Sequence, residues 1–163
     1  MLLRTWRLVA IMLTALSMGA ALAHLLEMPA KLNVDGAMWL TLLQTLYPPA
    51  FGTVGAACEV GAVVGVIALA FLVRRRRPAF GWTLLAAICL IATHAAFWIW
   101  VAPVNATMGP LTPETLPPEW VRLRNQWEYT HAARAVLQII ALAALVLSIL
   151  VETPANVPKG QAA

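Results

Sequence analysis

The sequence predicts an all-α integral membrane protein, a four-helix bundle that forms a single domain over residues 1–163. Hydrophobic residues make up 61% of the chain and charged residues only 11%, whereas an ordinary soluble domain is about 25% charged. Four apolar runs, at about 8–26, 51–73, 80–102 and 129–151, approach or exceed the roughly 20 residues that a helix needs to cross a bilayer. Because lipid offers the backbone no hydrogen bonds, these runs must be helices.

The placement of arginine predicts the orientation. Arg74–Arg77 form one block between the second and third runs, and Arg4 and Arg7 precede the first run. The positive-inside rule places these residues, and therefore both termini, in the cytoplasm. The two longer loops, about 27–50 and 103–128, then face outward, and we expect the membrane to be the bacterial cytoplasmic (inner) membrane. An anionic-lipid site is a second interpretation of the arginine block.

The two ends of the chain raise separate questions. The first run has a basic start and an A-x-A pattern at Ala21–Ala23, as a cleavable signal peptide does, but it continues through Leu26, so we expect a retained helix. Nothing stops a helix from Glu119 onward. The fourth helix is therefore predicted over 119–151, about 48 Å long at 1.5 Å per residue, and extends beyond the outer membrane face. Residues 152–163 are expected to form a short flexible tail.

Two further segments have predicted packing roles. The stretch "AMWLTLLQTLY", bounded by Gly36 and by Pro48–Pro49, is predicted as a short amphipathic helix lying on the membrane. Gly61 and Gly65 form a G-x-x-x-G step, which lets helix backbones approach closely. We interpret this face as packing within the chain, with a homo-oligomer as the alternative.

Composition also excludes some classes of site. Cys58 and Cys89 lie inside apolar runs without the paired spacing of zinc or thioredoxin sites, so we expect small buried hydrophobes. The net charge of +4 forms no basic patch with interleaved aromatic residues, so nucleic acid is not an expected partner.

Ionisable groups gather in the outer half of the predicted bundle. Counted from the outer surface, Glu59 and His94 lie about 12 Å deep and Arg134 about 8 Å deep. One stripe of the fourth helix, with steps of four, three and four residues, holds Trp127, His131, Arg134 and Gln138. This stripe should face the bundle interior, because a charge near the bilayer centre costs at least about 2.5–3.5 kcal/mol. Glu59 and Arg134 are candidate partners, and His94 can bond either of them.

Three segments, in this order, carry a resemblance to a known family: "GAALAHLLEMPAKL" at 19–32, "WVAPVNATM" at 100–108 and "WEYTHAARAV" at 127–136. With four spans, the chain resembles the anthrone oxygenase-like family, also called the domain of unknown function 1772 family. The resemblance implies small four-helix membrane proteins, of which the fungal ones are tied to oxidation of anthrones to anthraquinones without a dedicated organic cofactor. The family motif falls here on Pro29, Asn105, Trp127, His131 and Arg134. Met28 departs from the family pattern, since a histidine is common just before that proline.

The residues of the motif suit proton abstraction from an acidic C–H group. An anthrone-like substrate that loses this proton becomes an electron-rich enolate, which reacts with oxygen directly. We predict His131 as the base, because imidazole exchanges a proton near neutral pH, and Arg134 as the group that stabilises the oxyanion. The predicted substrate-binding residues are Trp127, Asn105, Trp98, Glu59 and His94. No cofactor and no metal are expected, and the expected partners are membrane lipid, oxygen and a lipophilic small molecule.

Two other functions stay open at this point. A metal or haem redox protein is suggested by His24, Glu27, Glu59, His94, Glu128 and His131, because di-metal sites in bundles use Glu and Glu-x-x-His ligands from facing helices. Here one such motif is reversed and one single ligand is a histidine, and a bis-histidine haem would need His94 and His131 at similar heights. The other alternative is a non-catalytic membrane subunit or interaction protein, whose buried polar groups only fix the packing.

Overall fold

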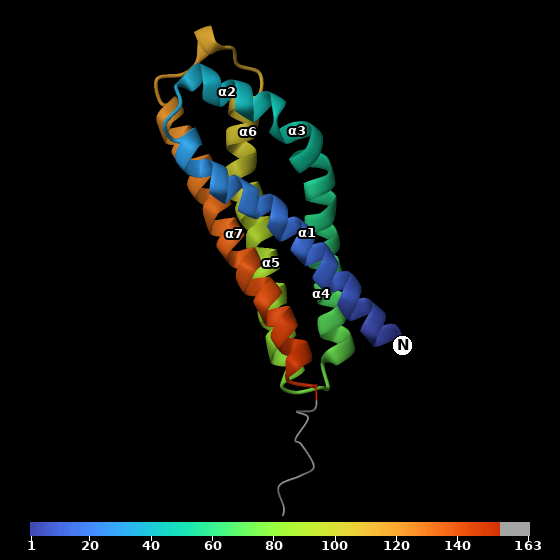
Figure 1. The fold of residues 1–163 in the computed structure, drawn as a ribbon. Coiled ribbons are helices and arrows are strands. Elements are labelled where there is room, and N and C mark those ends of the chain that lie inside the picture. The colour runs from blue at the N-terminus through green and yellow to red at the C-terminus, as the bar shows by residue number, and fades with distance from the viewer. Residues whose placement is uncertain (154–163) are drawn as a thin grey trace, which may run out of the picture.

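The computed structural model describes residues 1–153, which are helical almost throughout (Figure 1). The helical stretches Leu2–Lys31, Gly36–Val73, Ala79–Met108 and Trp120–Leu150 are long and apolar enough to cross a membrane. No strand occurs in the described part of the chain. The predicted fold class, an all-α four-helix bundle of membrane type, is therefore confirmed.

Four long helices build the bundle: α1 (Leu2–Lys31), α4 (Ala56–Val73), α5 (Ala79–Ala96) and α7 (Trp120–Leu150). α1 and α5 each pack against both α4 and α7, so the four helices form a closed ring. The chain leads into α4 through α2 (Gly36–Thr45), α3 (Tyr47–Ala50) and a π-helical turn, η1 (Phe51–Gly55). It leaves α5 through a second π-helical turn, η2 (Phe97–Val101), α6 (Ala102–Met108) and a 3-10 turn, η3 (Pro113–Thr115).

The N-terminus, the end of α7 and the arginine loop lie together at one end of the bundle (Figure 1). Glu152, just after α7, pairs with Arg7 of α1 and with Arg76 of the loop. We call the part of the bundle near this end the inner half and the part covered by α2 the outer half. The shared end suits the predicted orientation, while the side of the membrane on which it lies stays a prediction.

Small residues fill the inner half, where the helices approach closely. The buried ones are Ala10, Ala62, Gly65, Ala86, Ala87, Ala141 and Ala144. A Cβ added at Gly65 would lie 3.9 Å from the Cα of Ala10, and one added at Gly61 would lie 3.3 Å from Leu13. The Nε1 of Trp6 donates to the carbonyl of Gly65 at 2.9 Å. The G-x-x-x-G step thus packs within the chain, and a homo-oligomer through the same face stays a prediction.

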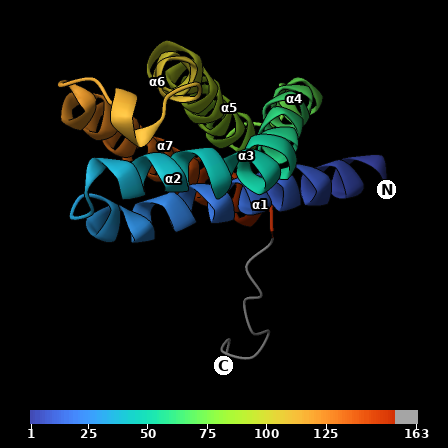
Figure 2. The ribbon, with the colours of Figure 1, turned by 90° about the horizontal axis from the view of Figure 1, so that it is seen from above.

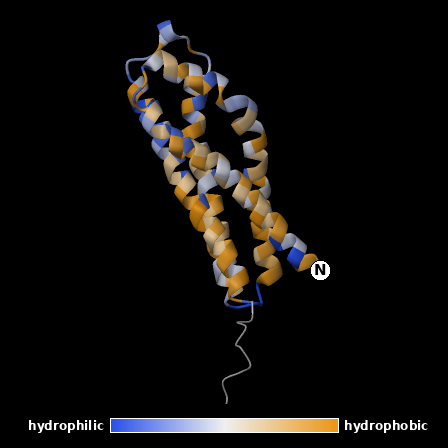
Figure 3. Ribbon diagram, in the orientation of Figure 1, coloured by the Kyte–Doolittle hydropathy of each residue, from blue (hydrophilic) through white to orange (hydrophobic). Residues whose placement is uncertain are grey.

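Hydropathy differs between the halves (Figure 3). Hydrophobic residues dominate the helices of the inner half, whereas hydrophilic residues are mixed into the helices of the outer half. Cys89 is buried and Cys58 half-buried, both as free thiols within this framework.

Two helices are longer than the sequence predicted. α1 runs over Leu2–Lys31, not 8–26, and carries Pro29 in its last turns. The helix that begins with α5 continues past residue 102, through the π-helical turn η2 and into α6, which contains Pro103. α7 extends over Trp120–Leu150, against the predicted 119–151. Of the predicted tail, residues 154–163 lie outside the described residues.

The segment predicted to lie on the membrane surface instead covers the bundle. α2 crosses the outer end from the side of α7 to that of α4 (Figures 1 and 2). Trp39 and Leu40 are each 1% exposed and pack in a cluster with Met108 and Trp127. The helix begins at a cap in which Asp35 accepts from the backbone N–H of Met38 at 2.8 Å. The apolar face of α2 is therefore satisfied by protein, so this helix is a roof over the four long ones.

Candidate functional site

A pocket of about 560 Å³ lies in the outer half, beneath α2 and α3. All four long helices contribute to its wall, and most of the wall is apolar. The titratable side chains on the wall are His24, Tyr47, Glu59, His94, His131 and Arg134. A pocket of this size and character is typical of small-molecule sites, which combine an apolar lining with a few polar groups.

The predicted ion pair joins α4 to α7 at the bottom of the pocket. Nη2 of Arg134 lies 2.6 Å from Oε2 of Glu59, and both side chains are buried. Gln138 Nε2 also donates to that carboxylate oxygen, at 3.4 Å, and Arg134 Nε donates to the carbonyl of Thr93 at 3.2 Å. Because each charge has a partner of opposite sign and further hydrogen bonds, the pair can persist at membrane depth.

His94 extends this pair toward the surface. Its Nδ1 lies 3.0 Å from Oε1 of Glu59, and its Nε2 lies 3.0 Å from the indole Nε1 of Trp98. An indole N–H can only donate, so Nε2 of His94 is the acceptor and its ring proton sits on Nδ1, where it serves Glu59. Both nitrogens of His94 are therefore occupied within the protein.

The same reasoning fixes the proton of His131. Nη1 of Arg134 lies 2.9 Å from Nδ1 of His131, and a guanidinium can only donate. Nδ1 of His131 therefore accepts, and the ring proton sits on Nε2. Nε2 is buried with no hydrogen-bond partner among the described residues. A continuous chain of hydrogen bonds thus runs from Trp98 through His94, Glu59 and Arg134, and ends at a free N–H of His131.

His24 lies against this free end. Its ring stacks on that of His131, with ring centroids 4.1 Å apart and an angle of 24° between the planes. The rings of Tyr47, Phe51 and Trp127 surround it at 4.6–5.1 Å. Nδ1 of His24 is also buried without a hydrogen-bond partner in the described part of the chain. Buried polar atoms are normally satisfied, so these two imidazoles, with Oε1 of Gln138, which also lines the pocket and has no partner within residues 1–153, are the candidate groups for hydrogen bonds to a ligand.

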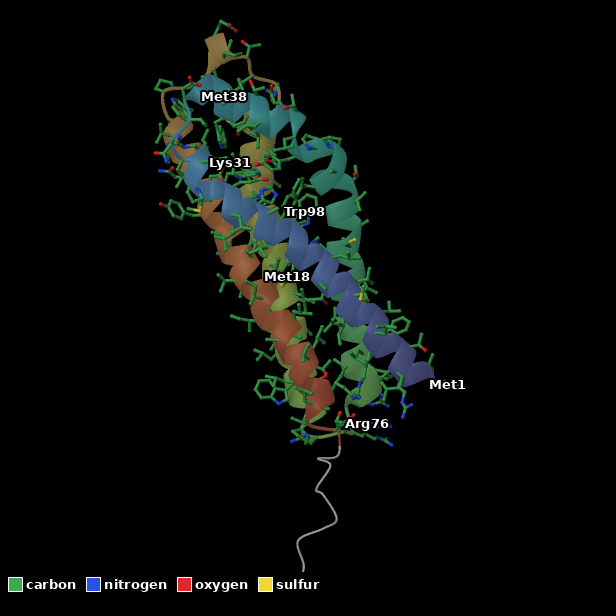
Figure 4. The ribbon with its side chains drawn as sticks, viewed as in Figure 1. Met1, Met18, Lys31, Met38, Arg76 and Trp98 are labelled. Carbon is green, nitrogen blue, oxygen red and sulfur yellow. The ribbon has the colours of Figure 1, made fainter. Side chains whose placement is uncertain are left out.

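Trp127 and Asn105 form the outer wall. The indole Nε1 of Trp127 donates to Oδ1 of Asn105 at 2.8 Å, and the Trp127 ring lies 4.1 Å from that of His131. Trp127 is 2% exposed. Trp98, in contrast, lies at the edge of the pocket, and 62% of its surface is exposed. In Figure 4 it is labelled between helix α4 and the helices α5 and α6.

The structure brings every predicted site residue into one pocket. The seven are His131, Arg134, Trp127, Asn105, Trp98, Glu59 and His94. Of the motif positions, Pro29 alone lies outside, exposed on α1. The sequence reasoning considered His24 only as a candidate metal ligand and not as a substrate-binding residue, although its position one turn before Met28 on the same helix was the available signal. The catalytic and substrate-binding roles of these residues stay predictions.

A second polar cluster, which the sequence did not predict, lies between α1 and the outer part of α7. Nζ of Lys31 is 2.9 Å from Oε2 of Glu128 and 3.7 Å from Oε2 of Glu27. Trp39 Nε1 donates to Glu128 at 3.1 Å, and the Tyr47 hydroxyl donates to Glu27 at 2.7 Å. The four-residue step from Glu27 to Lys31 was the only signal in the sequence. These bonds fasten the roof to the bundle.

The candidate metal ligands separate into these two clusters. Among the described residues, no three side chains of His, Cys, Asp or Glu converge on a point where they would hold a metal ion. Glu27 and Glu128 are turned toward Lys31, Tyr47 and Trp39, and Glu59 is turned toward Arg134. The di-metal arrangement considered from the sequence is therefore not formed by these side chains.

No family model, no curated protein and no solved structure matches this chain. The resemblance to the anthrone oxygenase-like family thus stays a prediction. The helices define the class of protein: a four-helix protein of integral membrane type. Its bacterial inner-membrane location stays a prediction.

Proposed function

We propose that this protein is a membrane enzyme that oxidises a lipophilic, enolisable ring ketone with molecular oxygen, without a dedicated organic cofactor or metal. The observation that carries the proposal is the stacked pair His24–His131: both residues line an apolar pocket beside the Arg134–Glu59 pair, and each keeps one buried ring nitrogen without a hydrogen-bond partner in the part of the chain that the structure describes. Enolate chemistry needs a base, a donor for the oxyanion and a pocket that accepts flat apolar rings.

The positions of the ring protons suggest how the two histidines divide the work. Nδ1 of His131 receives the Arg134 bond, so His131 offers an N–H from Nε2 and serves as hydrogen-bond donor to the substrate oxygen. His24 has no such bond to a cation and keeps a lone pair for the substrate proton. This assignment moves the base from His131, where the sequence reasoning placed it, to His24. Arg134 then acts indirectly: it holds His131 in the tautomer that donates from Nε2, and it adds positive charge near the oxyanion.

The reaction balances without another reagent. His24 takes a proton from the CH₂ group next to the conjugated ring system, and the electron pair of that C–H bond becomes the enolate, whose oxygen faces His131. The enolate transfers one electron to oxygen, and the two radicals combine to form a C–O bond. Return of the proton gives a hydroperoxide, which loses water as its remaining C–H bond breaks. The sum is CH₂ plus O₂ giving C=O plus water.

Oxygen uptake tests this proposal. The purified protein in lipid nanodiscs is supplied with anthrone, and oxygen consumption and anthraquinone formation are followed together. We expect equal molar amounts of both, and a loss of about 10²–10⁴-fold in rate for His24→Gln and for His131→Gln, because a positioned acid–base group contributes about that much. Tyr129→Phe, an exposed position on α7 outside the pocket, is the matched control.

Two results would contradict it. Uptake that survives both histidine substitutions would remove the stacked pair from the chemistry. Tight binding of anthrone by the parent without any uptake would instead favour the non-catalytic membrane subunit, in which the same pocket only holds a ligand.

A further inference from the structure

The exposed part of the pocket wall is confined to one side of the bundle. Pro48, Gly52, Ala56 and Val60 are exposed, line the pocket and follow one another at four-residue steps. This spacing places them on one face of the continuous helical stretch from α3 to α4. Trp98 of η2 and Gly109, at the end of α6, are the exposed lining residues opposite. The wall residues on α1 and α7 are buried or half-buried, so they form the closed back of the pocket.

This side opening, which we call the slit, has an apolar rim. None of its six residues carries a charge or an ionisable side chain. Val60, 48% exposed, lies thirteen residues before Val73, or about 20 Å from the arginine loop at 1.5 Å per residue. A hydrocarbon core is about 30 Å thick, so the lower part of the slit lies at the depth of lipid chains and not of headgroups.

The roof covers the outer end of the pocket and is hydrogen-bonded to its surroundings. The side-chain Nε2 of Gln44 on α2 lies within hydrogen-bond distance of three carbonyl oxygens at and just after the end of α6, those of Met108, Gly109 and Leu111, at 3.3, 3.1 and 2.8 Å, and its two N–H groups are shared among them. Tyr47, at the start of α3, is buried and bonds Glu27 of α1. The roof is therefore fastened to the end of α6 on one side and to α1 on the other.

The walls of the slit share an unusual backbone. η1 and η2, the two π-helical turns, lie one on each side of it and contribute Phe51, Gly52, Gly55, Phe97 and Trp98 to the pocket. Isolated π-helical turns are rare and occur frequently at functional sites. η1 packs against α1 and makes no extensive contact with η2 or α6, so the two walls are held apart at this level.

We infer that the pocket opens sideways into the outer leaflet, and that its ligand is an uncharged molecule dissolved in the membrane that enters between α4 and η2. Trp98 stands at the threshold, tethered to His94 by its indole N–H. A charged ligand would meet an apolar rim within lipid, whereas a neutral ring system would pass from acyl chains to aromatic side chains and reach His24 and His131. The ligand class deepens the proposed function, but the sideways opening does not depend on catalysis.

Spin-label accessibility tests the opening directly. In a Cys58→Ser, Cys89→Ala background, single cysteines replace Ala56, Val60 and, as a roof control, the exposed Thr45 of α2, and each carries a nitroxide in lipid nanodiscs. We expect the nitroxides at 56 and 60 to collide more with oxygen, which concentrates in lipid, than with a charged nickel chelate, and the nitroxide at 45 to show the reverse. Preferential collision of the chelate at position 60 would overturn the inference and leave the proposed oxidation unaffected.

Filling the slit tests its use. Ala56→Trp narrows the rim, and Val64→Trp, four residues further along the same face but outside the pocket, is the matched control. We expect the association rate of anthrone, followed by tryptophan fluorescence, to fall about tenfold in Ala56→Trp, as for a blocked gate, and to stay within about twofold in Val64→Trp. Equal rates in both variants would overturn the route. Because binding is the readout, a parent without oxidase activity would refute the proposed function alone.

Discussion

The same four helices pack closely in the inner half of the bundle and enclose a pocket in the outer half. In the inner half, alanine and glycine let α1 approach α4 closely, and Gly65 packs on Ala10. In the outer half, the helices stand far enough apart to enclose a pocket of about 560 Å³, and an ion pair with its hydrogen bonds connects them. Close packing of small residues therefore dominates the inner half, and a buried polar network is added to the apolar contacts of the outer half.

The inner half of the bundle therefore mainly stabilises the fold, and the outer half holds the candidate site. A close-packed inner half needs no cavity and no charge, so it can fix the relative positions of the helices. The unpartnered nitrogens of His24 and His131 in the outer half lower the stability of the protein. The packing of the inner half and the contacts of the roof offset this loss. Substitutions in the two halves should therefore differ in their effects on unfolding free energy and on ligand binding. Four experiments test this difference.

The largest effect is expected at the pair that spans the outer half. Glu59→Leu or Arg134→Met alone leaves a buried charge without its partner, which should lower the free energy of unfolding by about 3–5 kcal/mol. The double variant removes both charges and should be more stable than either single variant. Unfolding by denaturing detergent measures all three, and single variants as stable as the parent would show that the pair does not form.

Overfilling the inner half should come next. Gly65→Leu drives a side chain into Ala10 of α1, where Gly65→Ala makes only ordinary contact at 3.9 Å. We expect the leucine variant to lose up to about 3 kcal/mol of unfolding free energy, as overpacked cores do, and the alanine variant to lose much less. Ligand binding per folded molecule should stay unchanged in both. A loss of binding without a loss of stability would contradict the division into halves.

A smaller effect is expected at the wall of the pocket. Asn105→Ala leaves the indole N–H of Trp127 without its acceptor, which should cost about 1–2 kcal/mol. Adding Trp127→Phe removes the orphaned donor and should recover part of that loss. Thermal unfolding in detergent compares the two variants. If the double variant is no better than Asn105→Ala, the hydrogen bond contributes little.

The smallest effect is expected at the inner end. Glu152→Gln removes the acid that Arg7 and Arg76 share. Arg76 is 57% exposed, whereas Arg7 and Glu152 are 13% and 22% exposed, so the cost should be about 1 kcal/mol, the upper end of the range for surface pairs. The difference between variant and parent should also shrink as salt is raised, since mobile ions screen such pairs. A loss comparable to that of Glu59→Leu would mean that the inner end is held by charge and not by packing.

The sequence was sufficient for the fold because lipid narrows the choices. Long apolar runs could only be helices, and the depth of Glu59 and Arg134 on those helices was enough to pair them. Helix ends were less predictable, because polar residues at the ends of α1 do not stop a helix, and Pro103 in a first turn does not either. The roof was misplaced, because an amphipathic helix can bury its apolar face in lipid or in protein, and periodicity does not distinguish the two.

The site was predictable as a set of residues and not as an arrangement. Depth counting indicated that His94, Glu59, Arg134 and His131 meet, since rise per residue is constant along a helix. It could not show that His24 stacks on His131, because that contact depends on the rotation of α1 about its own axis. Nor could it show which nitrogen of His131 carries the proton, because the donor to Nδ1 is set by the rotamer of Arg134.

The ion pair between α4 and α7 also has a consequence for how the protein is made. Glu59 leaves the ribosome 75 residues before Arg134, an interval of about 4–15 s at ordinary rates of synthesis. During that time the first three helices can already be in the membrane, and the carboxyl group of Glu59 must wait there without its guanidinium. His94, on the helix made in between, is the partner that reaches it first, at 3.0 Å in the finished protein. We therefore expect His94 to be the first hydrogen-bond partner of Glu59 during synthesis, before Arg134 is made.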